Sequence, residues 1–448
     1  MQMKEVMYEA GLVGCGGAGF PTHVKYSGGK IDTVIINGAE CEPLLQTDQY
    51  LMRHFAGRLV KTAEKLRIEA GAKQCIFALK KTYLAEKEAL EEAVRESGGA
   101  VTLCLLDSFF PAGDEQTLVY EVTGRIVPPA SIPLDVGCAV TNVATLLGIA
   151  DAMQGNPFTD KYLTVTGAVK EPVVVRVPLG TPVSEVLKLA GGPLISDYIL
   201  VNGGPMMGKV LEDENHAWVT KTMSGLLVLP ADSAVARRAR ASVAHMMNLA
   251  KSACIQCRYC SDLCPRALLG HPLRPHQIMR KFSSGREIGD LLEDADIRNA
   301  ALCCECGVCE VFACPMGLQP RRINGLIKKE LSEAGIRWQG QKEGLLVQRE
   351  RAGRKIPTGR AAARAGVGAY VKQKTDTYRE LNDGEVTFVR LELRQGIGAP
   401  SIPVAGDGAW VKRGERIAEC PEGKLGSNLH ASISGVVSVR ETYMEIRA

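Results

Sequence analysis

Residues 254–265 read Cys-Ile-Gln-Cys-Arg-Tyr-Cys-Ser-Asp-Leu-Cys-Pro, so cysteines stand at 254, 257, 260 and 264 and a proline follows the last. A second run begins at Cys303, places further cysteines at 306, 309 and 314, and again ends in Cys-Pro. A thiolate at every third residue allows one tight loop to bind three corners of a [4Fe–4S] cubane. The two runs therefore predict two iron–sulfur clusters.

The fourth cysteine of each run is expected to bind the cluster held by the other run, as in bacterial two-cluster ferredoxins. The predicted ligands of one cluster are Cys254, Cys257, Cys260 and Cys314. The predicted ligands of the other are Cys303, Cys306, Cys309 and Cys264. Two features depart from the ferredoxin spacing, because an extra residue precedes Cys314 and because Cys304 adds a thiol beside Cys303. Either Cys303 or Cys304 is therefore the ligand.

Structural zinc and disulfide bonds are the alternative interpretations of these cysteines. Zinc needs four ligands and gives no reason for two tripled runs that each end in Cys-Pro. Disulfides are disfavoured because cysteines spaced C-x-x-C crowd one loop and do not cross-link distant segments. The other cysteines are scattered and are expected to be small buried apolar residues: Cys15, Cys41, Cys75, Cys104, Cys138, Cys304 and Cys420.

The whole-chain properties describe an ordinary globular protein. A length of 448 residues favours about two to four domains, and 46% apolar with 23% charged residues is typical of soluble folds. The net charge of +4 is too small to predict binding to nucleic acid or to a membrane surface. The sequence contains no run of about 18 apolar residues, so no transmembrane helix is predicted. The N-terminus lacks an apolar signal segment, and we expect a cytoplasmic protein whose fifteen cysteines stay reduced.

Residues 14–19, Gly-Cys-Gly-Gly-Ala-Gly, contain the spacing G-x-G-x-x-G. The dinucleotide fingerprint needs a strand before these glycines and a helix directly after them. Here a helix is expected before them, over 3–10, and Pro21 follows, so an ordinary Rossmann site is not predicted. The bare backbone amides of such a loop can still approach a phosphate closely. A tight structural turn is the alternative.

A buried strand is predicted over 33–37, and its carboxyl end leads into a polar loop that carries Glu40 and Glu42. Ligands of open α/β sheets bind at this end of the strands. Helices over 44–70 and 84–97 alternate with strands over 74–80 and 100–106. This alternation predicts a mostly parallel sheet covered by helices.

The composition changes near residue 160, where short strands and a helix over 182–190 predict a small α+β module. Between Arg337 and Lys374 the chain has ten Lys or Arg against two Glu. This composition predicts a flexible or partly helical connector, with a basic face for an acidic redox partner as the alternative. Short β-rich pieces over 386–448 resemble the two halves of a biotinyl/lipoyl barrel-sandwich module. The lysine that would carry a prosthetic group is absent, so a docking or structural element is expected.

Several of these motifs resemble known families. Residues 14–25 and Asn37-Gly-Ala-Glu-Cys-Glu-Pro43 resemble the FMN- and NADH-binding flavoprotein subunit of respiratory complex I. Pro111-Ala-Gly-Asp-Glu-Gln and Gly203-Gly-Pro-Met-Met-Gly208 are similar to the C subunit of the Rnf electron-transport complex. The barrel-sandwich module comes last in the chain, which resembles the cobalamin reductases of propanediol-utilising bacterial microcompartments. The resemblance covers nearly the whole chain except the linker.

The resemblance implies a multidomain α/β protein with an FMN domain like that of the complex I flavoprotein. The implied parts are an FMN/NADH-binding domain (1–157), a small α+β ubiquitin-like SLBB domain (158–230), a helical two-[4Fe–4S] ferredoxin-like domain (231–334), a basic linker (335–385) and a β barrel-sandwich module (386–448).

It also implies which residues bind the cofactors. The loop at 14–19 would hold FMN, Lys25 and Asn37 would contact the flavin, and Asn142 would lie near the phosphate. Glu40 and Glu42 would line the flavin and nicotinamide pocket, with Glu42 as the catalytic carboxylate that orients the nicotinamide. The implied cofactor-binding residues are Gly14, Gly16, Gly17, Ala18, Gly19, Lys25, Asn37, Glu40, Glu42 and Asn142.

The expected function follows from the chemistry of these cofactors. A flavin takes up a hydride, which carries two electrons, and releases single electrons to iron–sulfur clusters. The resemblance to cobalamin reductases implies the acceptor, so we expect an oxidoreductase that passes electrons from NADH through FMN and two [4Fe–4S] clusters to a corrinoid, reducing cob(III)alamin and cob(II)alamin. The alternatives are an electron-transfer subunit that serves ferredoxin or a membrane complex, and a scaffold with structural clusters. The implied partners are NADH, a corrinoid or corrinoid-binding protein, a microcompartment shell and an adenosyltransferase, in the cytoplasm or inside a microcompartment.

Overall fold

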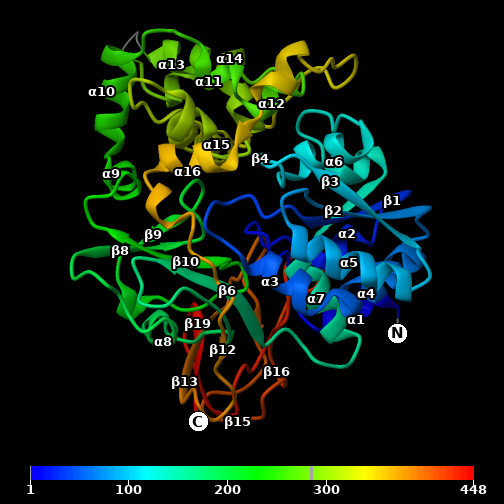
Figure 1. Cartoon of the computed structure of the whole chain (residues 1–448). Helices are drawn as coiled ribbons and strands as arrows, with labels where there is room; N and C mark the ends of the chain where they lie inside the picture. Colours follow the sequence, from blue (N-terminus) through cyan, green and yellow to red (C-terminus); the bar gives the residue numbers. More distant parts are fainter. Residues whose placement is uncertain (1, 283–285) are drawn as a thin grey trace.

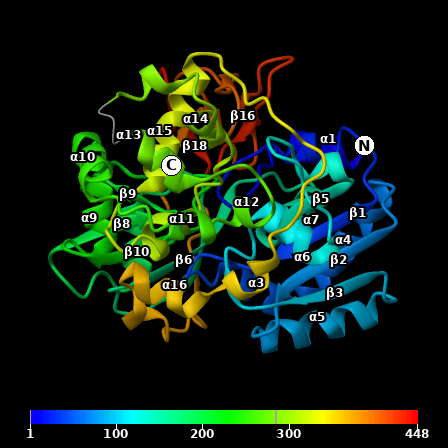
Figure 2. The ribbon, with the colours of Figure 1, turned by 90° about the horizontal axis from the view of Figure 1, so that it is seen from above.

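The computed structural model describes residues 2–282 and 286–448. Figure 1 shows an α/β domain (blue to cyan), a second sheet (green), a helical region at one end and small β-sheets (red) at the other. The helical region carries both cysteine runs, and in the view from above α12 lies beside α6 of the α/β domain (Figure 2). No helix among the described residues is long and apolar enough to cross a membrane.

The α/β domain is built on four parallel strands in the order β3-β2-β1-β5. Their bounds are Thr33–Gly38 (β1), Gln74–Lys80 (β2), Val101–Leu106 (β3) and Cys138–Asn142 (β5). Val34, Ile35 and Ile36 of β1 are fully buried, as a strand covered on both faces requires. The prediction of a parallel sheet is confirmed.

Helices cover both faces of this sheet. One face packs against α1 (Met3–Glu9), α3 (Thr47–His54), α4 (Ala56–Glu69), α5 (Leu84–Glu96) and α7 (Val143–Ala152), and the other packs against α6 (Glu115–Thr123). The single helix predicted over 44–70 is interrupted at Phe55, where the backbone leaves the helical conformation. The ring of Phe55 packs edge-on against Tyr162, so a contact with the second sheet accompanies the break.

The second sheet has the strand order β12-β7-β6-β10-β8-β9. Its bounds are Asp160–Gly167 (β6), Val173–Pro178 (β7), Tyr198–Asn202 (β8), Lys209–Leu211 (β9), Gly225–Pro230 (β10) and Tyr378–Glu380 (β12), with α8 at Val183–Leu189. Leu163, Val175 and Val186 belong to one apolar core beneath this sheet. The predicted small α+β module is therefore present, and β12 joins its edge from far along the chain.

The segment predicted as a basic linker, 335–385, is ordered over its second half. It contains β11 (Ile356–Pro357), which pairs with β4 (Phe109–Phe110), then α16 (Thr358–Ala365), then β12. Within this segment, the longest stretch without a helix or strand is 336–348. Of the two forms predicted for the connector, flexible or partly helical, the second applies to this half, because three alanines at helical spacing bury one face of α16. These residues are Ala361, Ala362 and Ala365.

The helical region is made of short helices that alternate with the cysteine loops. Its helices are α9 (Ala234–Arg240), α10 (Val243–Ala253), α11 (Tyr259–Asp262), α12 (Pro265–Leu268), α13 (Pro275–Phe282), α14 (Ala295–Arg298) and α15 (Pro320–Glu333). Ile278, Phe282 and Ile327 are fully buried in a core of their own. Ser242 and Asp294 cap α10 and α14 by accepting backbone hydrogen bonds, which satisfies free amides at the helix starts.

The C-terminal residues form two sheets, β13-β19-β18-β15 and β14-β16-β17. Their bounds are Phe388–Glu392 (β13), Ile402–Pro403 (β14), Trp410–Val411 (β15), Arg416–Glu419 (β16), Leu429–His430 (β17), Gly435–Val439 (β18) and Tyr443–Arg447 (β19). Val389, Ile417 and Ile446 pack into the same apolar core as Leu163 and Val175 of the second sheet. The module is therefore a docked structural element.

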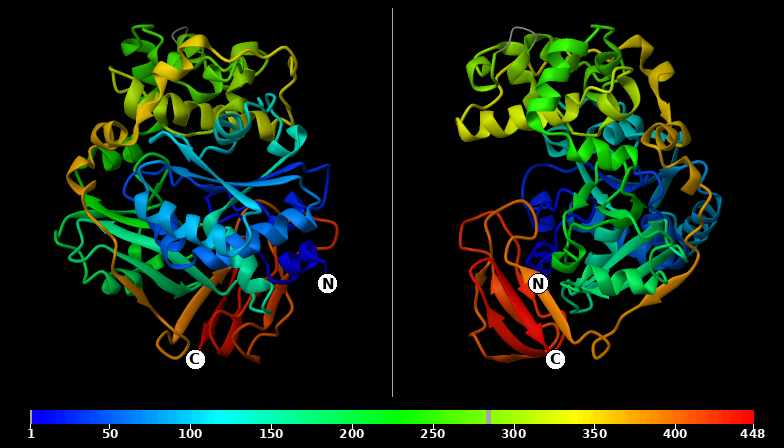
Figure 3. Two further views of the ribbon diagram at one scale, coloured as in Figure 1. Left: turned by 45° about the vertical axis from the view of Figure 1, so that its right-hand side comes forward. Right: turned by 90° about the vertical axis from the view of Figure 1, so that its left-hand side faces the viewer.

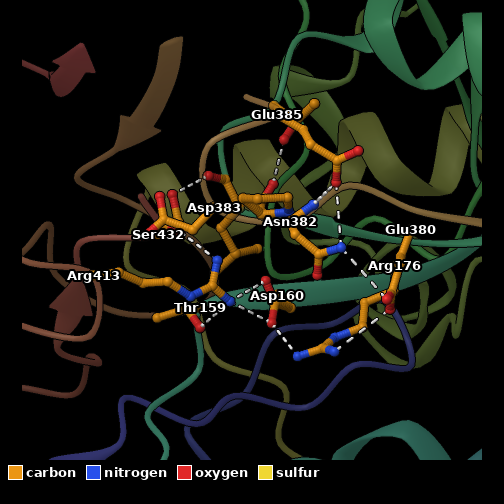
Figure 4. A network of polar contacts seen from close by, with 12 residues as sticks. Thr159, Asp160, Arg176, Glu380, Asn382, Asp383, Glu385, Arg413 and Ser432 are labelled. Carbon is orange, nitrogen blue, oxygen red and sulfur yellow. Dashed lines mark hydrogen bonds and ion pairs between the residues drawn. The ribbon is translucent and has the colours of Figure 1, made fainter. Parts of the chain in front are cut away.

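Polar contacts hold the same junction (Figure 4). Arg413 donates to both carboxylate oxygens of Asp160 at 2.7 Å, and Arg176 donates to the same carboxylate at 2.6 Å. Ser434 Oγ and Asp383 lie 3.1 Å apart and join the connector to the module. Figure 3 shows the connector (orange) running along the outside of the molecule from the helical region to this junction.

Lys221 is completely buried where three regions meet. Its ammonium donates at 2.7 Å to the carbonyl of Gly11, next to α1, and at 2.7 Å to the carbonyl of Asn428 in the C-terminal module. Burial lowers the pKa of Lys221 to about 7. The folded protein therefore holds this proton less tightly than the unfolded chain does.

This shift predicts a pH dependence of stability. Between about pH 7 and pH 10 the unfolded chain binds more protons than the folded protein, so the free energy of unfolding is expected to rise with pH. Lys221→Met is expected to flatten this rise, whereas the exposed Lys170→Met is the control that keeps it. Anaerobic urea denaturation at several pH values, followed by tryptophan fluorescence, measures the slope. An unchanged slope in Lys221→Met would contradict the prediction.

Candidate functional site

A cavity of about 490 Å³ opens where the α/β domain, the second sheet and the helical region meet. Small-molecule sites have volumes of roughly 300–1,000 Å³. The cavity lies at the carboxyl ends of β1 and β5, where ligands of parallel sheets bind. The structure brings together every predicted cofactor-binding residue except Gly17 along its wall: Gly14, Gly16, Ala18, Gly19, Lys25, Asn37, Glu40, Glu42 and Asn142.

The glycine loop is closed by a hydrogen bond of 2.8 Å from Gly14 N to the Phe20 carbonyl. Cys15 N donates to Thr145 Oγ1 at 2.8 Å, which holds the loop against the first turn of α7. Gly19 has a φ of +64°, and a Cβ there would lie 2.8 Å from the Cα of Gly396. Glycine is therefore required at 19, because the C-terminal module approaches the loop closely.

Asn142 ends β5 and caps α7. Its Oδ1 accepts from Ala144 N at 2.9 Å, and its Nδ2 donates to Asp48 Oδ2 at 2.7 Å. The helix N-terminus beside the glycine loop supplies free amides and a positive dipole end, which together favour an anion. Burial raises the pKa of Asp48 to about 6, although the hydrogen bond from Asn142 opposes the shift.

Lys161 on β6 lines the same cavity and was not predicted from the sequence. The residue is 2% exposed, and its ammonium makes no hydrogen bond or ion pair with any described residue. It lies near Asp48, since its charge lowers the pKa of that carboxyl. No motif marks a single lysine within a strand of a separate module, so only the docking of the two domains reveals it.

Lys25 and Asn37 line the cavity, and both also make hydrogen bonds to other residues of the protein. Lys25 Nζ donates to Glu115 Oε1 at 2.6 Å and to the Val140 carbonyl at 3.1 Å. Asn37 Nδ2 donates to the Gly113 carbonyl at 2.9 Å, so its position is fixed by the loop before α6. Both side chains are therefore preorganised at the cavity wall.

The two carboxylates of the acidic loop have different environments. Glu40 Oε2 is buried without a hydrogen-bond partner, and burial together with the Asp48 carboxylate raises the pKa of Glu40 well above its ordinary value. Lys80 Nζ donates at 2.7 Å to the Glu40 carbonyl and fixes the loop from below. Glu40 thus has a carboxyl oxygen available to a ligand in the cavity.

Glu42 is instead bound to the second-sheet module. Its Oε2 accepts from Met206 N at 2.9 Å and its Oε1 accepts from Met207 N at 2.7 Å. A Cβ at Gly204 would lie 2.2 Å from the Glu42 carboxylate, so glycine is needed there. Burial raises the pKa of Glu42 to about 7. Both carboxylate oxygens therefore anchor a loop of the second-sheet module, while Glu42 also lines the cavity. Its expected role in orienting the nicotinamide stays a prediction.

The residues of this cavity fit FMN. Buried polar atoms normally have a hydrogen-bond partner, yet Thr22 Oγ1 and Glu40 Oε2 have none among the described residues, and both residues line the cavity. The glycine loop, the start of α7 and Lys161 form an anion-binding end. The polar wall formed by Asn37 and Glu40 suits the heteroatoms of a flavin ring.

The cysteines form two separate sets in the helical region. Four of them line one small hollow, namely Cys254, Cys257, Cys260 and Cys314. Five line a second hollow, namely Cys264, Cys303, Cys304, Cys306 and Cys309. The fourth cysteine of each run therefore lies with the other run, in the arrangement expected for two cubanes.

The loops that carry these cysteines use an unusual backbone conformation. Gln256, Arg258 and Glu305 have positive φ values of 52°, 67° and 56°, which non-glycine residues adopt uncommonly. These residues lie between successive cysteines and curl the chain around each hollow. Among the described residues, no three His, Cys, Asp or Glu side chains are grouped closely enough to hold a single metal ion. A [4Fe–4S] cubane differs from a single ion, because each of its four irons binds a different cysteine and the thiols stand further apart.

The extra residue before Cys314 is absorbed by a π-helix over Val308–Ala313. A π-turn accommodates one additional residue within a helix and is frequent at functional sites. It allows Cys309 to face the second hollow while Cys314 reaches the first. The departure from ferredoxin spacing therefore leaves the two sets of cysteines intact.

Cys304 and Cys306 line both the large cavity and the second hollow. The two sites consequently share a wall. The second hollow has five thiols where a cubane binds four, so one of them is spare. Cys304, the extra thiol of the sequence, lies on the shared wall.

Comparison with known proteins identifies the parts of the chain. Residues 7–151 match the Nuo51 FMN-binding domain, residues 162–210 match the SLBB domain and residues 253–319 match the 4Fe-4S dicluster domain. An NAD⁺-reducing [NiFe]-hydrogenase in the H₂-reduced state has a similar fold, with a TM-score of 0.50 and 20% identity over 73% of this chain and 62% of that chain.

Curated relatives extend over nearly the whole chain. The cobalamin reductase PduS of Citrobacter freundii is 40% identical over 97% of this chain and 94% of its own length. The PduS of Salmonella typhimurium is 40% identical over 98% and 94%. The C subunit of the Na⁺-translocating ferredoxin:NAD⁺ oxidoreductase complex of Acetobacterium woodii is 35% identical over 59% of this chain and 57% of its own length. The chain belongs to the cobalamin reductase PduS family.

Proposed function

We propose that this protein passes electrons from NADH, through FMN and two [4Fe–4S] clusters, to a corrinoid. The shared wall of Cys304 and Cys306 is the observation that carries the proposal, because it places a flavin-sized cavity directly beside a cysteine-lined hollow. FMN accepts a hydride and releases single electrons to clusters. The relatives named cobalamin reductase support a corrinoid as the acceptor.

Different residues of the chain bind the phosphate of FMN, position its ring and hold the two clusters. The loop at 14–19 and the start of α7 bind the phosphate of FMN, and Lys161 supplies a counter-charge from the second-sheet module. Asn37, Lys25 and Glu40 position the ring. The cysteines hold one cluster with Cys254, Cys257, Cys260 and Cys314, and the other with Cys264, Cys306, Cys309 and either Cys303 or Cys304.

Electrons leave the protein at the first hollow, which is lined by Cys254, Cys257, Cys260 and Cys314. Cys257 is exposed, and Ile255 and Met316 beside it are 60% and 42% exposed. None of these residues lines the large cavity, so an acceptor can reach this hollow from outside while the cavity is occupied. A corrinoid held by a binding protein or an adenosyltransferase suits such a surface, and a location within a microcompartment next to its shell is part of the proposal. The alternative, electron delivery to a redox protein, rests on the relationship to the ferredoxin:NAD⁺ oxidoreductase complex.

Phosphate recognition by Lys161 is tested by comparing two flavins. Lys161→Gln is expected to weaken FMN binding at least tenfold while leaving riboflavin affinity unchanged, because only FMN carries the phosphate. Quenching of flavin fluorescence on titration of flavin-depleted protein measures both affinities. Lys170→Gln removes one exposed positive charge from the same module and is the control. Equal weakening of both flavins would show that Lys161 only balances Asp48.

The exit is tested at Cys257. Cys257→Ser is expected to abolish NADH-dependent reduction of cobalamin while FMN content and ferricyanide reduction persist, because the cavity does not include this hollow. Iron analysis and absorbance spectra under anaerobic conditions check that the second cluster remains. Cys420→Ser, which alters a thiol of the C-terminal module, is the control. Retention of cobalamin reduction in Cys257→Ser would mean that electrons leave elsewhere.

A further inference from the structure

Asp114 and Arg266 form a buried ion pair between the α/β domain and the helical region. Arg266 donates to Asp114 through both arms of the guanidinium, Nη1 to Oδ2 at 2.6 Å and Nη2 to Oδ1 at 2.9 Å. Their side chains are only 8% and 14% exposed. Asp114 also caps α6 by accepting from Thr117 N at 3.1 Å, so the carboxylate is fixed from both sides.

The burial of both charges makes this ion pair energetically costly. Removing two charges from water is costly, and a buried pair persists only with good geometry and further hydrogen bonds. The two-armed contact meets that condition, since charge-assisted bidentate bonds are strong and directional. Loss of one partner alone would leave the other charge buried and unpaired.

The pair also lies between the two redox sites. Asp114 lines the large cavity together with Cys304 and Cys306. Arg266 stands two residues after Cys264, and Cys264 and Pro265 line the second hollow. One charge of the pair is thus placed at the flavin side and the other beside the loop that holds a predicted cluster ligand.

We propose that the Asp114–Arg266 pair is a positioning pair that sets the reduction potential of the second cluster relative to the flavin. The inference rests on the proposed function, in which the second hollow holds a [4Fe–4S] cluster. Reduction of that cluster adds one electron, supplied by NADH through FMN, and therefore one negative charge. A nearby guanidinium stabilises the reduced cluster and a nearby carboxylate destabilises it, so the intact pair cancels most of both effects.

This cancellation predicts shifts of opposite sign. Asp114→Asn leaves the guanidinium uncompensated and is expected to raise the potential of the second cluster. Arg266→Gln leaves the carboxylate uncompensated and is expected to lower it. The double variant Asp114→Asn/Arg266→Gln is neutral at both positions and is expected to return the potential close to that of the wild type. It also provides a test if either single variant fails to fold.

Anaerobic redox titration of the holoprotein, followed by electron paramagnetic resonance, measures both cluster potentials in the same sample. The first cluster is the internal reference, because its hollow is not lined by Cys264 or Pro265, the residues that directly precede Arg266. Glu121–Arg351 is the matched control: its atoms lie 2.6 Å apart, its side chains are 12% and 11% exposed, and neither residue lines the cavity or a hollow. Glu121→Gln and Arg351→Gln are expected to leave both potentials unchanged.

The possible results separate the inference from the proposed function. Shifts of the second cluster alone, with opposite signs in the single variants, support the pair. Shifts of the same sign, no shift, or equal shifts of both clusters would overturn it while leaving the proposed function intact. Wild-type protein that contains FMN but only one cluster, shown by iron and flavin analysis, would overturn the proposed function and the inference together.

Discussion

The common wall between the flavin-sized cavity and the second cysteine hollow is the constraint on which this structure depends. Two cysteines, Cys304 and Cys306, face both spaces. A carrier that accepts a hydride can pass single electrons to a one-electron carrier only when the two lie side by side. The remaining architecture keeps that wall in place, since the cavity is lined by residues from the α/β domain, the second sheet, the helical region and the C-terminal module.

Polar anchors join these regions. Glu42 holds the loop at Met206 and Met207, Lys221 joins Gly11 to the C-terminal module, and Arg266 joins the cysteine loops to Asp114. Lys221 and Arg266 are buried, and Glu42 is partly buried. Each anchor uses backbone groups or a bidentate ion pair, which restrict geometry more than apolar packing does. The C-terminal sheets take part in this closure because Gly396 packs directly on Gly19.

Local patterns in the sequence predicted much of this arrangement. Cysteine spacing predicted the two sets of thiols, and hydrophobic runs such as Val34–Ile36 predicted the buried parallel sheet. Contacts between domains were not predictable in the same way. Nothing local to Glu42 shows that the backbone amides of Met206 and Met207 would bind its carboxylate. Lys161 carried no motif, and the buried alanine face of α16 was hidden by the basic composition around it.

The most direct test is an anaerobic crystal structure of the holoprotein with anomalous scattering from iron and bound FMN. The account predicts two four-iron peaks, one in each cysteine hollow, with FMN in the large cavity and nearer to the peak surrounded by Cys264, Cys306 and Cys309. Its phosphate should lie at the glycine loop and Lys161. A flavin nearer to the peak at Cys254, Cys257 and Cys260, or iron in only one hollow, would contradict the account.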